Sequence, residues 1–144
     1  MKKALVTTAV VISLFAVVFT GCRGMQRQEG RLTGVNTVGW EKLGQRNVRL
    51  AGEKDIIHVK MKKGMYRRIM FVVHRSAIEM YNVKVEFRNG QKFSPNTRLH
   101  FARDTRSRII DLPGGKRFIK KVEFRYKSKN VFTGKALVEL WGKR

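Results

Sequence analysis

Residues 81–87 read YNVKVEF, and the alternation of apolar and polar side chains in this stretch decides the fold class. Tyr81 and the apolar residues after it lie at every second position, with polar or charged residues between them. Successive side chains of a β-strand point to opposite faces of the sheet. The pattern therefore predicts a strand with one buried side and one side facing water. Residues 122–127 (VEFRYK) repeat it, and we interpret Phe118, Phe124 and Tyr126 as core aromatics of one strand.

Other segments extend the same interpretation outward along the chain. Residues 69–73 (IMFVV) are apolar at odd and even positions alike, so both faces of this strand would be apolar. This is typical of a central strand covered on both sides. Asn89-Gly90 follows the first strand and predicts a hairpin with a type I′ turn. No apolar stripe of helical period extends over ten residues or more. Shorter strands are expected at 48–50, 55–61, 98–101, 108–112 and 135–141.

About eight short strands separated by turn residues predict an all-β fold over residues 39–144. We expect an antiparallel β-sandwich of the jelly-roll kind, with a small β-barrel as the alternative. Residues 23–38 contain three glycines and little apolar periodicity, so residues 22–38 are expected to form a flexible tether in front of the domain.

The N-terminus has the layout of a secretory signal peptide. Lys2 and Lys3 precede an uncharged apolar stretch that ends in Phe19-Thr20-Gly21-Cys22. This ending resembles a bacterial lipobox, which implies cleavage after residue 21 and a lipid on Cys22. An uncleaved anchor helix and simple cleavage that leaves a free thiol are the alternatives.

The lipobox resemblance implies that Cys22 holds the protein in the membrane of a bacterial cell envelope. Arg23 follows the cysteine, where an aspartate would mark retention in the inner membrane in the enterobacterial pattern. We therefore expect the outer membrane if the host has one, and otherwise the cell membrane.

Several motifs of the domain resemble a set of small secreted bacterial all-β proteins that have no assigned activity. They are residues 40–44 (WEKLG), 55–57 (DII), 89–90 (NG), 107–115 (SRIIDLPGG) and 117–126 (RFIKKVEFRY). The resemblance spans roughly residues 39–142. It implies a β fold and export, and it implies no catalytic residue.

The charge of the chain is the strongest indication of a partner. Thirty-two Lys and Arg residues oppose ten Asp and Glu residues, so the formal net charge is +22. Removing residues 1–21 takes away only Lys2 and Lys3 and leaves +20, well above the magnitude of about 2–8 that solubility asks of a small domain. Self-repulsion on this scale favours a polyanionic partner. Export and the absence of a recognisable nucleic-acid-binding motif make nucleic acid an unexpected one.

Motifs for catalysis and for metal binding are missing. A single cysteine excludes an intramolecular disulfide and the Cys-rich zinc sites. His58, His74 and His100 lack metal-ligand spacing, and no serine lies in a nucleophile elbow. We interpret Glu86, Glu123 and Glu139 as surface partners of basic neighbours, and Asp111 as a cap of the following Pro-Gly-Gly turn. We therefore expect no enzyme, no cofactor and no metal site.

The functional hypothesis is a lipid-anchored, non-catalytic envelope protein. Its basic domain is expected to bind anionic envelope material such as lipid headgroups, lipopolysaccharide or acidic polymers. The alternative is a structural or assembly protein of the envelope that acts through protein partners. The candidate anion-binding residues are Arg108, Lys116, Arg117, Lys121, Arg125 and Lys127.

Overall fold

The computed structural model describes residues 35–49, 54–128 and 135–144. The expected signal peptide, Cys22 and the expected tether up to residue 34 lie outside the described residues. No helix in the described part of the chain is long and apolar enough to span a membrane.

Nearly all regular structure in the described residues is β-strand. One 3₁₀ helix, η1 (Met61–Lys63), interrupts the strands. The strands are β1 (Glu41–Val48), β2 (Lys54–His58), β3 (Met65–Tyr66), β4 (Arg68–His74), β5 (Ile78–Phe87), β6 (Lys92–Phe93), β7 (Leu99–Phe101), β8 (Thr105–Arg106), β9 (Ile110–Asp111), β10 (Arg117–Ser128) and β11 (Ala136–Lys143).

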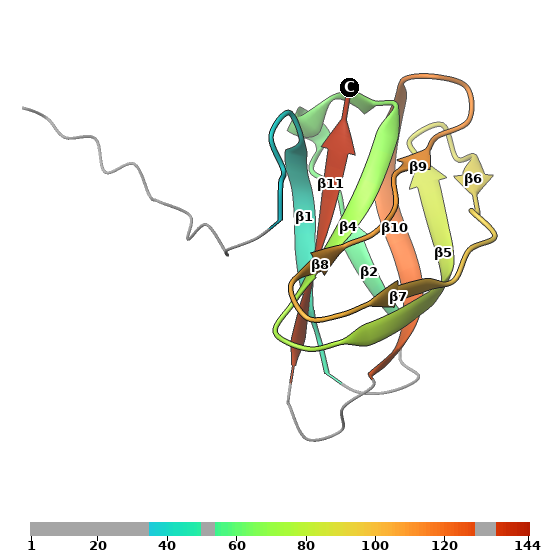
Figure 1. Cartoon of the computed structure of the whole chain (residues 1–144). Coiled ribbons are helices and arrows are strands. Elements are labelled where there is room, and N and C mark those ends of the chain that lie inside the picture. Colours follow the sequence, from blue (N-terminus) through green and yellow to red (C-terminus); the bar gives the residue numbers. More distant parts are fainter. Residues whose placement is uncertain (1–34, 50–53, 129–134) are drawn as a thin grey trace, which may run out of the picture. The chain divides into compact units, whose positions relative to one another are not determined.

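These strands form two antiparallel sheets that face each other across one core (Figure 1). The five-stranded sheet has the order β1-β11-β4-β8, and β9 also pairs with β4. The six-stranded sheet has the order β2-β10-β5-β6, with β3 on β10 and β7 on β5. The prediction of an all-β sandwich is confirmed. The barrel alternative is wrong, because the two sheets do not close on each other.

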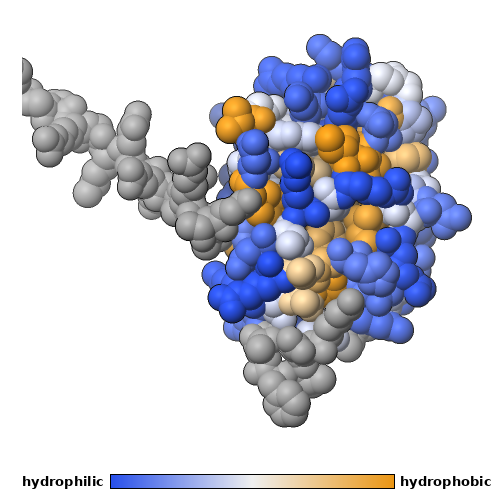
Figure 2. All heavy atoms as spheres, in the orientation of Figure 1, coloured by the Kyte–Doolittle hydropathy of each residue, from blue (hydrophilic) through white to orange (hydrophobic). Residues whose placement is uncertain are grey.

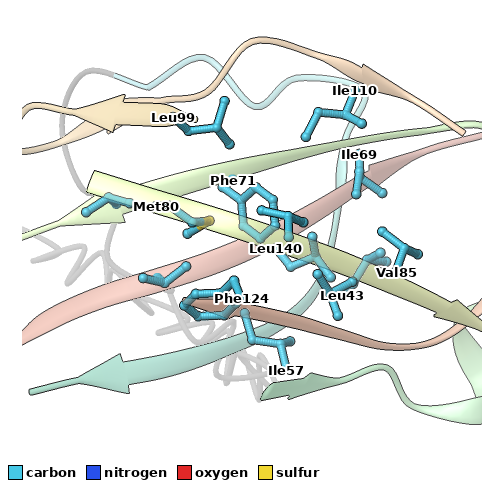
Figure 3. Close-up of a cluster of buried hydrophobic side chains, with 14 of the residues drawn as sticks. Leu43, Ile57, Ile69, Phe71, Met80, Val85, Leu99, Ile110, Phe124 and Leu140 are labelled. Atoms are coloured by element: carbon cyan, nitrogen blue, oxygen red, sulfur yellow. The ribbon is translucent and has the colours of Figure 1, made fainter. Parts of the chain in front are cut away.

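Side chains that alternate inward from both sheets fill the space between them. Figure 3 shows Phe71 and Leu140 of the five-stranded sheet in one cluster with Phe124 and Met80 of the six-stranded sheet. The ring centroids of Phe71 and Phe124 lie 6.1 Å apart in an edge-on arrangement. Each such side chain contributes about 1.5–3 kcal/mol through burial, so the core is the main source of stability.

The prediction of a doubly covered strand at residues 69–73 is confirmed. These residues belong to β4, which pairs with β11 on one side and with β8 and β9 on the other. None of them exposes more than 1% of its surface. The apolar side chains on both faces of β4 are therefore buried.

Three local predictions were wrong. The strand expected at 48–50 is the end of β1, which runs through the less apolar residues 41–48. The strand expected at 55–61 stops at His58 and gives way to η1. In the hairpin after β5, Gly90 has φ +86° but Asn89 does not have a positive φ. The turn is therefore not type I′, which needs positive φ at both central residues.

Candidate anion-binding face

The outer face of the six-stranded sheet carries the strongest candidate site, and β10 runs through it. Val122, Phe124 and Tyr126 point into the core and are at most 1% exposed. Lys121, Glu123, Arg125 and Lys127 alternate with them and point outward. The predicted parity of this part of β10 is confirmed.

Two bulges change the parity elsewhere on this face. The pairing of β10 with β5 shifts between Ile119 and Lys121, and again between Glu123 and Arg125. An extra residue in a strand moves the side chains beyond it to the other face. Phe118 is therefore 41% exposed and is not a core residue. Tyr81 likewise lies outside the core, since the second shift falls beside it, where Asn82 has φ +49°.

A shallow hollow of about 390 Å³ opens on this outer face. Four strands of the six-stranded sheet and the residue after β6 supply its lining, and lysine is the commonest residue type in it. We call it the lysine hollow; its lining residues are Lys54, Lys84, Glu86, Lys92, Phe93, Ser94, Lys121 and Glu123.

The strand register places the charges of the lysine hollow in alternation. Glu86 of β5 lies opposite Lys121 of β10 and opposite Lys92 of β6. Lys84 of β5 lies opposite Glu123 of β10. Opposite charges on neighbouring strands attract each other, so the outward side chains support the sheet as well as forming a surface.

The two glutamates of the hollow already form ion pairs with lysines. Glu86 accepts from Lys120 Nζ at 3.1 Å and from Lys121 Nζ at 3.3 Å, and Glu123 pairs with Lys54 Nζ at 3.1 Å. The hydrogen bond from Lys120 is the main reason that the pKa of Glu86 is lowered. Lys84 and Lys92 have no ion-pair partner among the described residues, so they are the cations that remain available to an anion.

The structure places three of the predicted residues on this face. Lys121 lines the lysine hollow. Arg125 lies farther along β10, opposite Tyr81 and Lys54. Lys127 lies beyond it, with its ammonium 5.8 Å from the centre of the Tyr81 ring. These three residues form one side of a common basic surface.

The other three predicted residues lie elsewhere. The Arg117 guanidinium stacks 4.0 Å above the Phe87 ring and donates to Gln91 and to the Pro113 carbonyl. It stands about 27 Å along β10 from Arg125 at the usual rise per residue. Lys116 is exposed in the turn before β10, and Arg108 is exposed just before β9, next to the five-stranded sheet. The six residues do not converge on one site.

Sequence reasoning missed Lys54, Lys84 and Lys92. Lys84 sits at an outward position of the alternation in residues 81–87, which was sufficient to find it. Lys54 and Lys92 lie on short strands whose sequences do not alternate, and only the pairing of those strands with β10 and β5 brings them to the hollow.

Two predictions about acidic residues were wrong. Asp111 accepts from Arg68 Nε at 2.9 Å across the β4–β9 pair, so it serves a strand pair and not the Pro-Gly-Gly turn. Glu139 faces away from the core as expected, but it is only 7% exposed. Lys42, His74 and Trp141 all bond to its carboxylate. Glu139 is therefore part of a buried polar network and not a surface partner.

His74 lies at the centre of that network and is buried. Its Nδ1 is 3.3 Å from Asp104 Oδ1 and its Nε2 is 3.3 Å from Glu139 Oε2. Within the described residues, no group of three or more His, Cys, Asp or Glu side chains is arranged to hold a metal ion. The network joins β4, β11, β1 and the turn between β7 and β8, which indicates a structural role.

The fold and the lysine hollow define the class as a small, strongly basic β-sandwich domain. Residues 10–142 match the family described as a domain of unknown function (DUF2541), and the chain belongs to that family. The expectation of a family without an assigned activity is confirmed. Comparison with curated proteins and with solved structures gave no match.

Proposed function

We propose that this protein is a membrane-anchored lipoprotein of the bacterial cell envelope, and that its β-sandwich binds anionic envelope material without catalysis. The lysine hollow is the observation that carries the binding half of the proposal. It combines Lys84 and Lys92, which lack acidic partners among the described residues, with Lys54 and Lys121, which sit beside them. The anchoring half is supported by the lipobox-like sequence that ends at Cys22.

The chemistry of the hollow suits phosphate or carboxylate groups on a repeating or clustered ligand. Lysine acts as a point charge with three donors and does not impose the planar geometry of arginine. The ring of Phe93 adds an apolar contact to the lining, and the Ser94 hydroxyl donates to the Val83 carbonyl at 2.9 Å. A headgroup, a lipopolysaccharide phosphate or an acidic polymer carries the charge that such a lining attracts.

The experiment that tests anion binding by the lysine hollow uses sodium polyphosphate as a soluble probe. Its binding to the full chain is measured by calorimetry. A cation near an anionic surface contributes about 1 kcal/mol. The double variant Lys84→Ser/Lys92→Ser should therefore lose about 2 kcal/mol, or roughly thirtyfold in affinity. Parent binding should also weaken strongly between low and high salt, because exposed charges are screened over about 8 Å at physiological ionic strength.

A matched control removes the same charge away from the hollow. Arg108 and Lys135 are exposed and have no ion-pair partner among the described residues. The double variant Arg108→Ser/Lys135→Ser should bind polyphosphate nearly as well as the parent. Equal losses in the two double variants would mean that only net charge matters. Binding that ignores salt would favour the alternative of an assembly protein that acts through protein partners.

A further inference from the structure

One end of the sandwich combines exposed apolar side chains with a dense set of cations. It is the upper end in Figure 1, where β1 begins, β11 ends and η1 lies. The turn before β10 lies at the same end. We call it the basic end and define it as residues 60–67, 113–118 and 143–144.

Three apolar side chains of the basic end face water. Met61 of η1 is 77% exposed, Met65 of β3 is 39% exposed and Phe118 of β10 is 41% exposed. Met65 and Phe118 are direct partners in the β3–β10 pair, so their side chains lie next to each other. The bulge in β10 is what turns Phe118 outward. A protein has no need of an exposed Met–Phe pair for its own core.

Exposed cations belong to the same segments as these side chains. Lys60, Lys62, Arg67 and Lys116 are exposed and have no ion-pair partner among the described residues. The Arg88 guanidinium lies 5.1 Å from the centre of the Phe118 ring, so one cation sits directly against an exposed apolar surface.

The acidic groups near the basic end are occupied. Glu41 pairs with Lys63 Nζ at 3.2 Å and with Arg144 at 3.3 Å, and it accepts from the Tyr66 hydroxyl at 2.7 Å. Asp111 pairs with Arg68. The unpaired charge of this end is therefore positive.

We propose that the basic end docks on an anionic lipid bilayer. Exposed Met and Phe side chains enter the boundary between headgroups and acyl chains, and the exposed Lys and Arg side chains engage the anionic headgroups, which is the combination that interfacial binding requires. A soluble polyanion uses the cations but leaves Met61, Met65 and Phe118 in water. The apolar side chains are therefore the feature that selects a bilayer.

This surface is separate from the lysine hollow, so the proposal does not depend on polyanion binding there.

The experiment reports the depth of a single residue, because the apolar stretch before residue 22 can by itself hold the full chain on any vesicle. A nitroxide is placed by Met61→Cys in the Cys22→Ser full chain, which is reconstituted in vesicles of phosphatidylcholine alone or with 30% phosphatidylglycerol. With the anionic lipid, collisions of the label with a water-soluble nickel reagent should fall severalfold and collisions with oxygen should rise. The control label Ala102→Cys is exposed in the turn after β7, at the opposite end of β4, and should not change.

Charge variants separate this surface from the hollow. Adding Lys62→Ser and Arg67→Ser to the labelled chain should abolish the change at position 61, while Lys84→Ser and Lys92→Ser should leave it intact. A label that stays in water in both vesicles overturns the proposal. Equal shielding at positions 61 and 102, shielding that ignores the anionic lipid, or shielding without vesicles through self-association also overturns it.

Discussion

Tyr66 shows how single residues join the two sheets at the basic end. Its ring is fully buried and packs against Gly142, while its hydroxyl donates to Glu41 Oε2 at 2.7 Å. Burial and this hydrogen bond raise the pKa of Tyr66 to about 12. The hydrogen bond from Tyr66 is in turn the main cause that lowers the pKa of Glu41. Tyrosine is required here because one side chain must supply both an apolar ring and a donor.

Gly142 is the residue that makes room for that ring. A Cβ at position 142 would lie 2.7 Å from Tyr66 Cδ1 and 2.9 Å from Leu43 Cδ1, closer than van der Waals contact allows. Gly142→Ala should therefore lower the free energy of unfolding by about 1–3 kcal/mol, which urea denaturation measures. Asn47→Ala on the exposed part of β1 is the control and should stay within about 0.5 kcal/mol. Equal stability of Gly142→Ala and the parent would contradict the close approach.

At the scale of the element, bulges decide which side chains form the surface. One extra residue in β10 exposes Phe118, and the shift beside Asn82 turns Tyr81 toward Lys127. Alternation in the sequence predicts only which side chains of a short segment share one face of the sheet. It does not reveal a shift that arises when two strands of unequal spacing pair. The basic end therefore owes its exposed Phe118 to a bulge.

Strand β11 depends on one buried carboxylate, which makes stability depend on pH. Burial alone would raise the pKa of Glu139, but the hydrogen bond and charge of Lys42 outweigh it, with help from Trp141 and His74, so the pKa is lowered below 4.5. Because the pKa of Glu139 is lower in the folded state than in the unfolded state, its carboxylate stabilises the protein at pH values above the unfolded-state pKa. This contribution is lost as the pH falls through the folded-state pKa.

Glu139→Gln tests this dependence. At pH 7 it should lower the free energy of unfolding by about 1–3 kcal/mol, because charged hydrogen bonds are replaced by neutral ones. As the pH falls through the lowered pKa of Glu139, the difference between variant and parent should shrink, since the parent side chain then becomes neutral like the variant's. Urea denaturation over a series of pH values measures it. A difference that stays constant with pH would show that the charge of Glu139 contributes nothing.

For the whole molecule, the charge and the N-terminal sequence have separate consequences. A formal charge of +22 repels itself in the folded state and attracts polyanions. Part of this charge lies in the lysine hollow and part at the basic end. The residues that line the lysine hollow are mostly charged, whereas the basic end also exposes Met61 and Phe118. The first suits a soluble or polymeric anion, and the second suits a bilayer.

Anchoring at Cys22 is the prediction that concerns the whole chain. Cys22→Ser removes the only thiol that a lipid can modify. In the native host, the variant should accumulate as an unprocessed precursor or leave the membrane fraction, whereas the parent should remain there after a high-salt wash. Gel mobility and fractionation measure both effects. Unchanged size together with unchanged partition would contradict lipidation and favour an uncleaved anchor.

The sequence by itself determined the fold class, the core parity of β5 and β10 over most of their length, and the central position of β4. These features follow from a period of two along a single strand, which is local information. The tertiary structure alone decided the rest. Lys54, Lys84, Lys92 and Lys121 meet because four strands pair in one register, and Phe118 faces water because of a bulge. Both depend on contacts between residues far apart in the chain, which no local pattern encodes.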